Sequence, residues 1–115
     1  MKMQHVTIRT VNFDEEVAFY MDIVGLRIVR DVRPARNMVF LANDEGETQV
    51  EIIETAEAEC SGNEYLSIGF HAEDTGALRE ELIAKGCEVS DMVSPNPHVK
   101  FFYVTDPAGV KVQFI

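Results

Sequence analysis

The sequence predicts an α+β fold made of two tandem βαβββ modules. The first observation behind this prediction is that the two halves of the chain repeat each other 62 positions apart. The second is that each half shows the same order of segments: a strand, a helix and three further strands. The matched apolar pairs are Val6 with Ile68, Ile8 with Phe70, Phe40 with Phe102, Val50 with Val112 and Ile53 with Ile115. The matched polar pairs are His5 with Ser67, Glu51 with Gln113, Asn12 with Asp74 and Asp44 with Asp106.

The first module spans residues 1–54. Residues 6–11 alternate as a strand does, and residues 13–24 place Phe13, Val17, Tyr20 and Val24 on one helical face. Asn12 stands at the helix N-cap with Glu15 three residues later, which is capping-box spacing, and Gly25 follows the helix as a C-terminal glycine. The remaining segments complete the module: a strand at 26–32, a break at 33–37, a strand at 38–42, a turn at 43–46 and a strand at 48–54.

Residues 55–63 are small, polar and acidic, and we expect them to link the modules. The second module, residues 64–115, repeats the first. A strand is expected at 65–72, and Asp74 caps a helix that carries Leu78, Leu82 and Ile83 and ends at Gly86. The later segments are a strand at 87–93, a break at 94–97, a strand at 99–105, a tight turn at 106–109 and a final strand at 111–115.

The composition bounds the class of protein. A chain of 115 residues with 46% hydrophobic and 26% charged residues suits one globular domain with its own core. The net charge of −10 argues against nucleic acid and anionic membranes as partners and favours a cationic ligand or a metal, although it also serves solubility alone. The sequence shows no apolar run of ~20 residues and no signal peptide at its start. Cys60 and Cys87 form no metal or redox spacing, so we expect a cytoplasmic protein.

Glu51 is the strongest functional candidate from residue chemistry. Its neighbours Val50 and Ile52 point to the opposite face of the strand, which must pack on the helices, so Glu51 lies on the concave face. A carboxylate there is costly unless it is paired, solvated or bound to a metal. His5, which shares its strand face with Thr7 and Arg9, is the second candidate. The alternative interpretation of both residues is an ordinary solvated surface.

The chain resembles the vicinal oxygen chelate superfamily, which includes glyoxalase I, bleomycin-resistance proteins and extradiol dioxygenases. Three segments carry the resemblance: the opening Gln4-His5-Val6-Thr7-Ile8, the helix with Phe19-Tyr20 leading to Val24-Gly25-Leu26, and the stretch from Phe102 to Gly109. The resemblance implies that the modules form a curved, incompletely closed eight-stranded mixed sheet around a cavity, with the helices outside. It also implies a homodimer.

In the glyoxalase I branch, the resemblance implies four metal ligands, at His5, Glu51, Ser67 and Gln113. His5 and Glu51 match the pattern, whereas Ser67 replaces a histidine and Gln113 replaces a glutamate. A serine hydroxyl is a poor ligand for zinc or nickel, and a carboxamide cannot act as a general base at neutral pH. The metal set reduces to His5, Glu51 and Gln113, with Glu51 as the base. The triad His5, Ser67 and Gln113 argues against extradiol dioxygenase chemistry.

These residues favour one function and leave two alternatives. The first is a protein that binds a small molecule in the concave cavity, with an incomplete metal site and Ser67, His71, Arg9 and Tyr103 as ligand contacts. The second is a lyase, isomerase or epimerase that uses one divalent ion (Ni, Zn, Co or Mn). The third is an interaction protein with a vestigial cavity. Arg9 is equally well explained as a surface arginine, and the face of Phe101 and Tyr103 as core packing.

Overall fold

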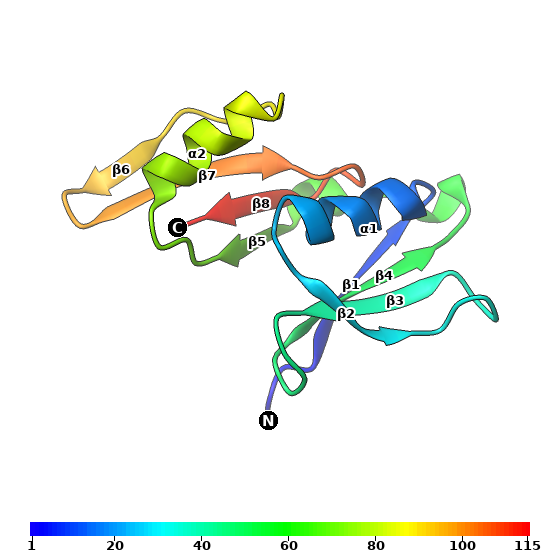
Figure 1. Cartoon of the computed structure of the whole chain (residues 1–115). Coiled ribbons are helices and arrows are strands. Elements are labelled where there is room, and N and C mark those ends of the chain that lie inside the picture. Colours follow the sequence, from blue (N-terminus) through cyan, green and yellow to red (C-terminus); the bar gives the residue numbers. More distant parts are fainter. The chain divides into compact units, whose positions relative to one another are not determined.

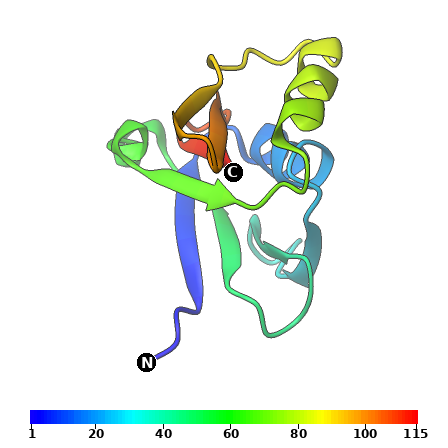
Figure 2. The same ribbon diagram turned by 90° about the vertical axis from the view of Figure 1, so that its left-hand side faces the viewer.

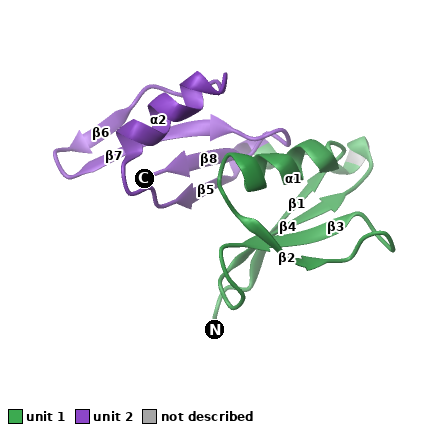
Figure 3. Cartoon of the chain, viewed as in Figure 1, with its two compact units in different colours: residues 1–63 green, residues 64–115 purple. Residues whose placement is uncertain are grey.

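The computed structural model describes residues 1–57 and 59–115. The chain forms two compact units, residues 1–63 and residues 64–115, which are coloured separately in Figure 3. Each unit holds one four-stranded mixed sheet and one helix in βαβββ order, as the sequence predicts. No helix among the described residues is long and apolar enough to cross a membrane.

The first unit contains one sheet with the strand order β1-β4-β3-β2 (Figure 1). Its elements are β1 (His5–Thr10), α1 (Phe13–Asp22), β2 (Arg27–Asp31), β3 (Met38–Ala42), β4 (Gln49–Glu54) and the short helix η1 (Glu57–Glu59). β1 runs parallel to β4, and the two lie side by side in both Figures 1 and 2. The other neighbours, β4 with β3 and β3 with β2, pair antiparallel.

One face of this sheet forms the core of the first unit. Ile8, Val39, Leu41 and Ile52 are completely buried, and their registers place them on the same face. α1 packs against β2, β3 and β4 and buries Phe13, Val17 and Tyr20, which confirms most of the predicted helical face. Val24 lies beyond the end of the helix, and the helix also buries Glu16, which its apolar periodicity does not predict.

The predicted capping box at the start of α1 is wrong. Asn12 is the N-cap residue, but its side chain makes no cap hydrogen bond. Its backbone, with φ −100° and ψ 55°, lies outside the extended region that N-cap residues usually adopt. The predicted C-terminal glycine is present: Gly25 has φ +85°, and the following Leu26 N–H donates to the Tyr20 carbonyl at 2.9 Å.

The second unit repeats this topology with the order β5-β8-β7-β6. Its elements are β5 (Ser67–Phe70), α2 (Thr75–Ala84), β6 (Val93–Asn96), β7 (Val99–Thr105) and β8 (Lys111–Phe114), while η2 (Asn63–Tyr65) begins at the boundary between the units. Asp74 caps α2 as predicted, because its carboxylate accepts the Ala77 N–H at 2.9 Å. Leu82 is buried, whereas Ile83 of the predicted apolar face is 42% exposed.

The strand predicted at residues 87–93 is wrong. Residues 87–92 lie outside the strands, and β6 instead covers Ser94-Pro95-Asn96, the segment predicted to break a strand. β6 is an edge strand whose register with β7 shifts between Val93 and Asn96. Proline is tolerated at such an edge because no neighbour needs its missing N–H on the outer side.

The repeat also has a one-residue shift that the sequence comparison misses. β1 with β5 and β4 with β8 keep the 62-residue offset, since His5 pairs with Gln49 and Ser67 pairs with Lys111. In the third strand of each module, however, Phe40 pairs with Glu51 while Tyr103 pairs with Gln113. The counterpart of Phe40 is therefore Tyr103 rather than Phe102. A shift of one residue moves side chains to the other face of a sheet, so the distinction decides which aromatic ring lies beside the polar residues.

Candidate functional site

Four side chains form a row straight across the sheet of the first unit, one from each strand. Thr7 of β1 pairs with Glu51 of β4, Glu51 pairs with Phe40 of β3, and Phe40 pairs with Arg30 of β2. Directly paired residues point to the same face of a sheet. This face is opposite to the one that carries Ile8 and Ile52 against the helix. We call Thr7, Glu51, Phe40 and Arg30 the cross-strand row.

The Glu51 carboxylate is buried and held in place by its neighbours. Its residue is 8% exposed, and the Thr7 hydroxyl donates to Oε1 at 2.5 Å. His5 Nε2 lies 3.8 Å from the same oxygen, and the His5 side chain is 42% exposed. A buried carboxylate is stable only with such partners, and it strongly favours a cation or a hydrogen-bond donor beside it. The structure thus brings the predicted residues His5 and Glu51 together.

Phe40 connects this acidic end of the row to a basic end. The edge of its ring meets the His5 ring, with the centroids 5.8 Å apart and the planes at 78°. The Arg30 guanidinium lies over the Phe40 ring, 5.2 Å from its centroid. Phe40 itself is 6% exposed. The row therefore places a carboxylate, an aromatic ring and a guanidinium next to one another.

The corresponding positions of the second unit carry no charge. Gln113 Nε2 donates to the Tyr103 hydroxyl at 3.3 Å, and Gly69 stands where the first unit has Thr7. A Cβ atom at Gly69 would lie 3.3 Å from Gln113 Oε1, so the glycine leaves room for the carboxamide. Ser67 lies at the exposed start of β5, in register with Lys111. The structure thus brings Gln113 and Tyr103 together within the second unit.

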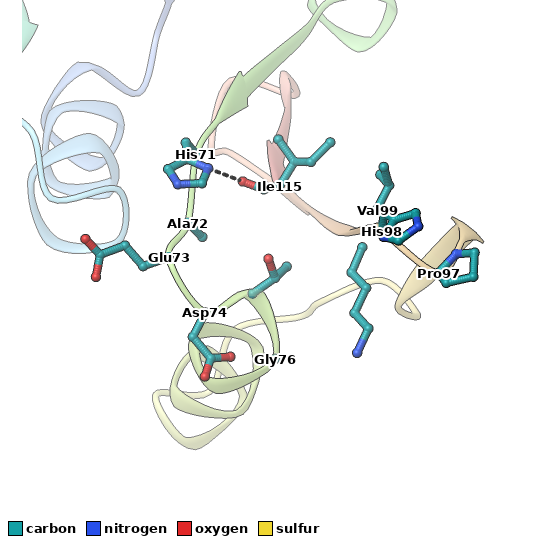
Figure 4. Close-up of a pocket in the computed structure, with 11 residues that line it drawn as sticks. His71, Ala72, Glu73, Asp74, Gly76, Pro97, His98, Val99 and Ile115 are labelled. Carbon is teal, nitrogen blue, oxygen red and sulfur yellow. Dashed lines mark hydrogen bonds between the residues drawn. The ribbon is translucent and has the colours of Figure 1, made fainter.

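His71 lies away from these residues, in a pocket of about 520 Å³ in the second unit (Figure 4). This pocket lies at the start of α2 and along the β6–β7 hairpin, between residues 71–76 and residues 97–100. His71 Nδ1 is 3.1 Å from the Ile115 carbonyl oxygen, the contact drawn as a dashed line. Of the predicted site residues, only His71 lines this pocket. Arg9, in register with Ile53, is exposed on the same sheet face as Thr7.

The first unit supplies part of a metal-ligand set. An imidazole nitrogen and a carboxylate oxygen are donors that zinc, nickel, cobalt and manganese accept, and His5 and Glu51 place one of each 3.8 Å apart. Among the described residues, no group of three or more His, Cys, Asp or Glu side chains is placed to hold a metal ion. Gln113, in the second unit, carries a carboxamide, which is a neutral oxygen donor.

The sequence patterns missed Thr7, Phe40 and Arg30 as members of the site. The alternation of β1 does place Thr7 on the face of His5, but its bond to Glu51 depends on how β1 pairs with β4. Phe40 and Arg30 enter through the antiparallel registers of β3 and β2. The available signal for Phe40 was the turn at residues 43–46, and the one for Arg30 was the break at residues 33–37, because the turn between two antiparallel strands limits which of their residues face each other.

Comparisons with known proteins agree with this architecture. The model of the family described as "Glyoxalase/Bleomycin resistance protein/Dioxygenase superfamily" matches residues 2–114. A lactoylglutathione lyase of Haemophilus influenzae is 27% identical, with 100% of this chain and 92% of that protein covered. One from Neisseria meningitidis is 25% identical, covering 100% of this chain and 90% of that protein.

Solved structures share the fold at lower identity. An antibiotic binding protein from a Streptomyces species superposes with a TM-score of 0.79 at 16% identity, covering 99% of this chain and 93% of that one. A lactoylglutathione lyase from Agrobacterium tumefaciens gives a TM-score of 0.75 at 20% identity, covering 98% and 91%. At these identities the likeness concerns the fold alone.

Proposed function

Because this chain belongs to the glyoxalase/bleomycin resistance protein/dioxygenase superfamily, we propose that it binds a small organic molecule at the face of its first sheet that carries the cross-strand row. The observation that carries the proposal is the buried Glu51 carboxylate beside the Phe40 ring. The carboxylate suits a cationic or hydrogen-bond-donating group of the ligand, and the Phe40 ring makes the surroundings of that carboxylate apolar. The net charge of −10 also attracts a cation from a distance. Arg9, Ser67, His71 and Tyr103 remain ligand contacts proposed from the sequence.

Replacing Glu51 with glutamine should weaken the binding of an aromatic cation such as 4-methylbenzylamine about tenfold, because a charge-assisted hydrogen bond is lost. Titration of the protein with this amine, followed by NMR chemical shifts, measures the change. Glu54→Gln is the matched control, since Glu54 lies on the same strand, is exposed and points to the other face. Equal affinities of Glu51→Gln and the unmodified protein would contradict the proposal.

The alternative function is a metal-dependent lyase, isomerase or epimerase, and the proximity of His5 to Glu51 favours it. His5, Glu51 and Gln113 would hold a divalent ion, which when bound polarises neighbouring oxygens of a substrate. Glu51 would act as the catalytic base and move a proton between adjacent substrate atoms. Thr7 and His5 both approach its Oε1, which leaves Oε2 as the oxygen to take the proton.

This alternative predicts that protein stripped with a chelator takes up stoichiometric Ni²⁺ in calorimetric titration. His5→Ala should weaken uptake more than about tenfold, because an imidazole is lost from the ligand set. His71→Ala is the control, as His71 contacts the Ile115 carbonyl within the second unit and is not one of the three proposed metal ligands, so its loss should leave the affinity unchanged. Absence of stoichiometric uptake of Ni, Zn, Co and Mn, or an equal loss in both variants, would rule the alternative out.

We also propose a homodimer in the cytoplasm. The dimer follows from the family resemblance, and sedimentation of the purified protein tests it. Cys60 and Cys87 are both free, which suits a reducing compartment.

A further inference from the structure

Four arginines, Arg27, Arg30, Arg33 and Arg36, lie along β2 and in the connection after it, and two of them form ion pairs with carboxylates. Arg27 pairs with Asp44 at 3.3 Å. Arg33 pairs with Asp31 at 2.7 Å, and its hydrogen bonds lower the pKa of the Asp31 carboxyl to about 2. Arg30 stands between them in sequence and makes no ion pair or hydrogen bond with any residue that the structure describes. Its charge is available to a ligand.

Phe40 holds the Arg30 guanidinium in place. The guanidinium carbon lies 5.2 Å from the centroid of the ring, within the range of a cation–π contact. Phe40 is itself buried and contacts the His5 ring edge-on, so its ring is held in position under the Arg30 guanidinium. The N–H groups of a guanidinium lie in its plane. A guanidinium that lies over a ring can therefore still donate two hydrogen bonds from its edge to a carboxylate or phosphate.

The row sets the separation between the basic and the acidic group. Arg30 pairs with Phe40, and Phe40 pairs with Glu51, so two strand spacings separate Arg30 from Glu51. Two spacings amount to ~10 Å between the backbones, with both side chains on the same face. An aromatic ring fills the interval between the charges.

The second unit lacks this pattern of charges. Gly69, Gln113 and Tyr103 occupy the equivalent positions, and Ser90 takes the place of Arg30, because its N–H donates to the Tyr103 carbonyl at 2.9 Å and its hydroxyl accepts the Tyr103 N–H at 2.8 Å. None of these four residues is ionised at neutral pH. The combination of an acid and a base across an aromatic ring belongs to the first unit.

We propose that Arg30 is an anion-binding residue of the site. The ligand then has a flat apolar part with two different ends: a carboxylate or phosphate group at one end, which Arg30 binds, and at the other end the group that Glu51 binds. This inference rests on the proposed function for the Glu51 end and extends it to a ligand with two unlike charged ends. Arg30 does not depend on Glu51 for its own contact with an anion, so the two ends can be tested separately.

Three rigid probes separate the two ends: 4-methylbenzylamine carries the cation alone, 4-methylbenzoate the anion alone, and 4-(aminomethyl)benzoate both. We expect 4-(aminomethyl)benzoate to bind about fivefold to tenfold more tightly than 4-methylbenzylamine, as a charge-assisted contact at an exposed site allows. NMR titrations give the affinities, and thermal unfolding confirms that each variant is folded.

Arg30→Gln should abolish the advantage of 4-(aminomethyl)benzoate and the binding of 4-methylbenzoate, without weakening the binding of 4-methylbenzylamine. Arg30→Lys should keep only part of the advantage, because an ammonium neither stacks nor grips an anion with two bonds. Arg36→Gln is the matched control and should change none of the affinities, since Arg36 is an exposed arginine of the β2–β3 connection.

Equal binding of 4-(aminomethyl)benzoate and 4-methylbenzylamine to the unmodified protein would overturn the inference, as would an advantage that survives Arg30→Gln. Failure of the proposed function gives a different result: 4-methylbenzylamine then binds without any dependence on Glu51, or does not bind at all. In that case, binding of 4-methylbenzoate that Arg30→Gln abolishes would still support the anion site.

Discussion

Replacing Phe102 with alanine should lower the free energy of unfolding by about 3–5 kcal/mol, the range for truncating a fully buried phenylalanine. Phe102 is completely buried, and its ring lies 5.3 Å from that of Phe114, centroid to centroid. The two residues are also paired in register across β7 and β8. Removing the ring leaves a cavity beside the Phe114 ring, on the core face of the second sheet, and urea denaturation measures the loss.

Phe101→Ala is the matched control for this prediction. Phe101 is the preceding residue of the same strand, it is half-buried, and it points to the opposite face, where its ring contacts Tyr103. Its replacement should cost about 1 kcal/mol, as is typical of a partly exposed position. If both variants lost the same free energy, the assignment of Phe102 to the core and of Phe101 and Tyr103 to the opposite face of the sheet would be incorrect.

The local patterns of the sequence predict most of the fold because each strand or helix has its own periodicity. The strands at residues 38–42 and 99–105 agree with β3 and β7 at both ends, since apolar and β-branched residues fill them and clear turn residues bound them. The prediction fails at β6, where an exposed edge strand has little need of an apolar pattern. Ser94-Pro95-Asn96 reads as a break, although edge pairing tolerates it.

The candidate site is less predictable than the fold because it depends on which residues face each other across strands. The chemistry of His5 and Glu51 marks them in the sequence, and the structure places them 3.8 Å apart. The one-residue shift between β3 and β7 is invisible to a comparison at constant offset, so Phe40 is matched to Phe102 instead of Tyr103. Arg30 is found only through the register of β2 with β3.

The turn between β7 and β8 provides the second large effect. Asp106 is 4% exposed, and its Oδ1 accepts the Ala108 N–H at 3.0 Å and the Val110 N–H at 2.9 Å. Asp106→Ala removes the acceptor from both donors, one of them on the completely buried Val110, and should cost about 2–3 kcal/mol in unfolding free energy. Asp106→Asn retains an acceptor oxygen and should recover more than half of the loss.

Asp74→Ala is the comparison that separates a buried turn from an exposed helix cap. The Asp74 carboxylate accepts the Ala77 N–H from an exposed position, so its loss should cost about 1 kcal/mol. Urea denaturation measures the unfolding free energies of Asp106→Ala, Asp106→Asn and Asp74→Ala. A loss in Asp106→Ala no larger than that in Asp74→Ala would contradict the assigned role of the turn.

The same turn joins the strand of Tyr103 to the strand of Gln113. Asp106→Ala should therefore also disturb the hydrogen bond between those two side chains, which is visible in NMR spectra as a change in the Gln113 side-chain amide signals.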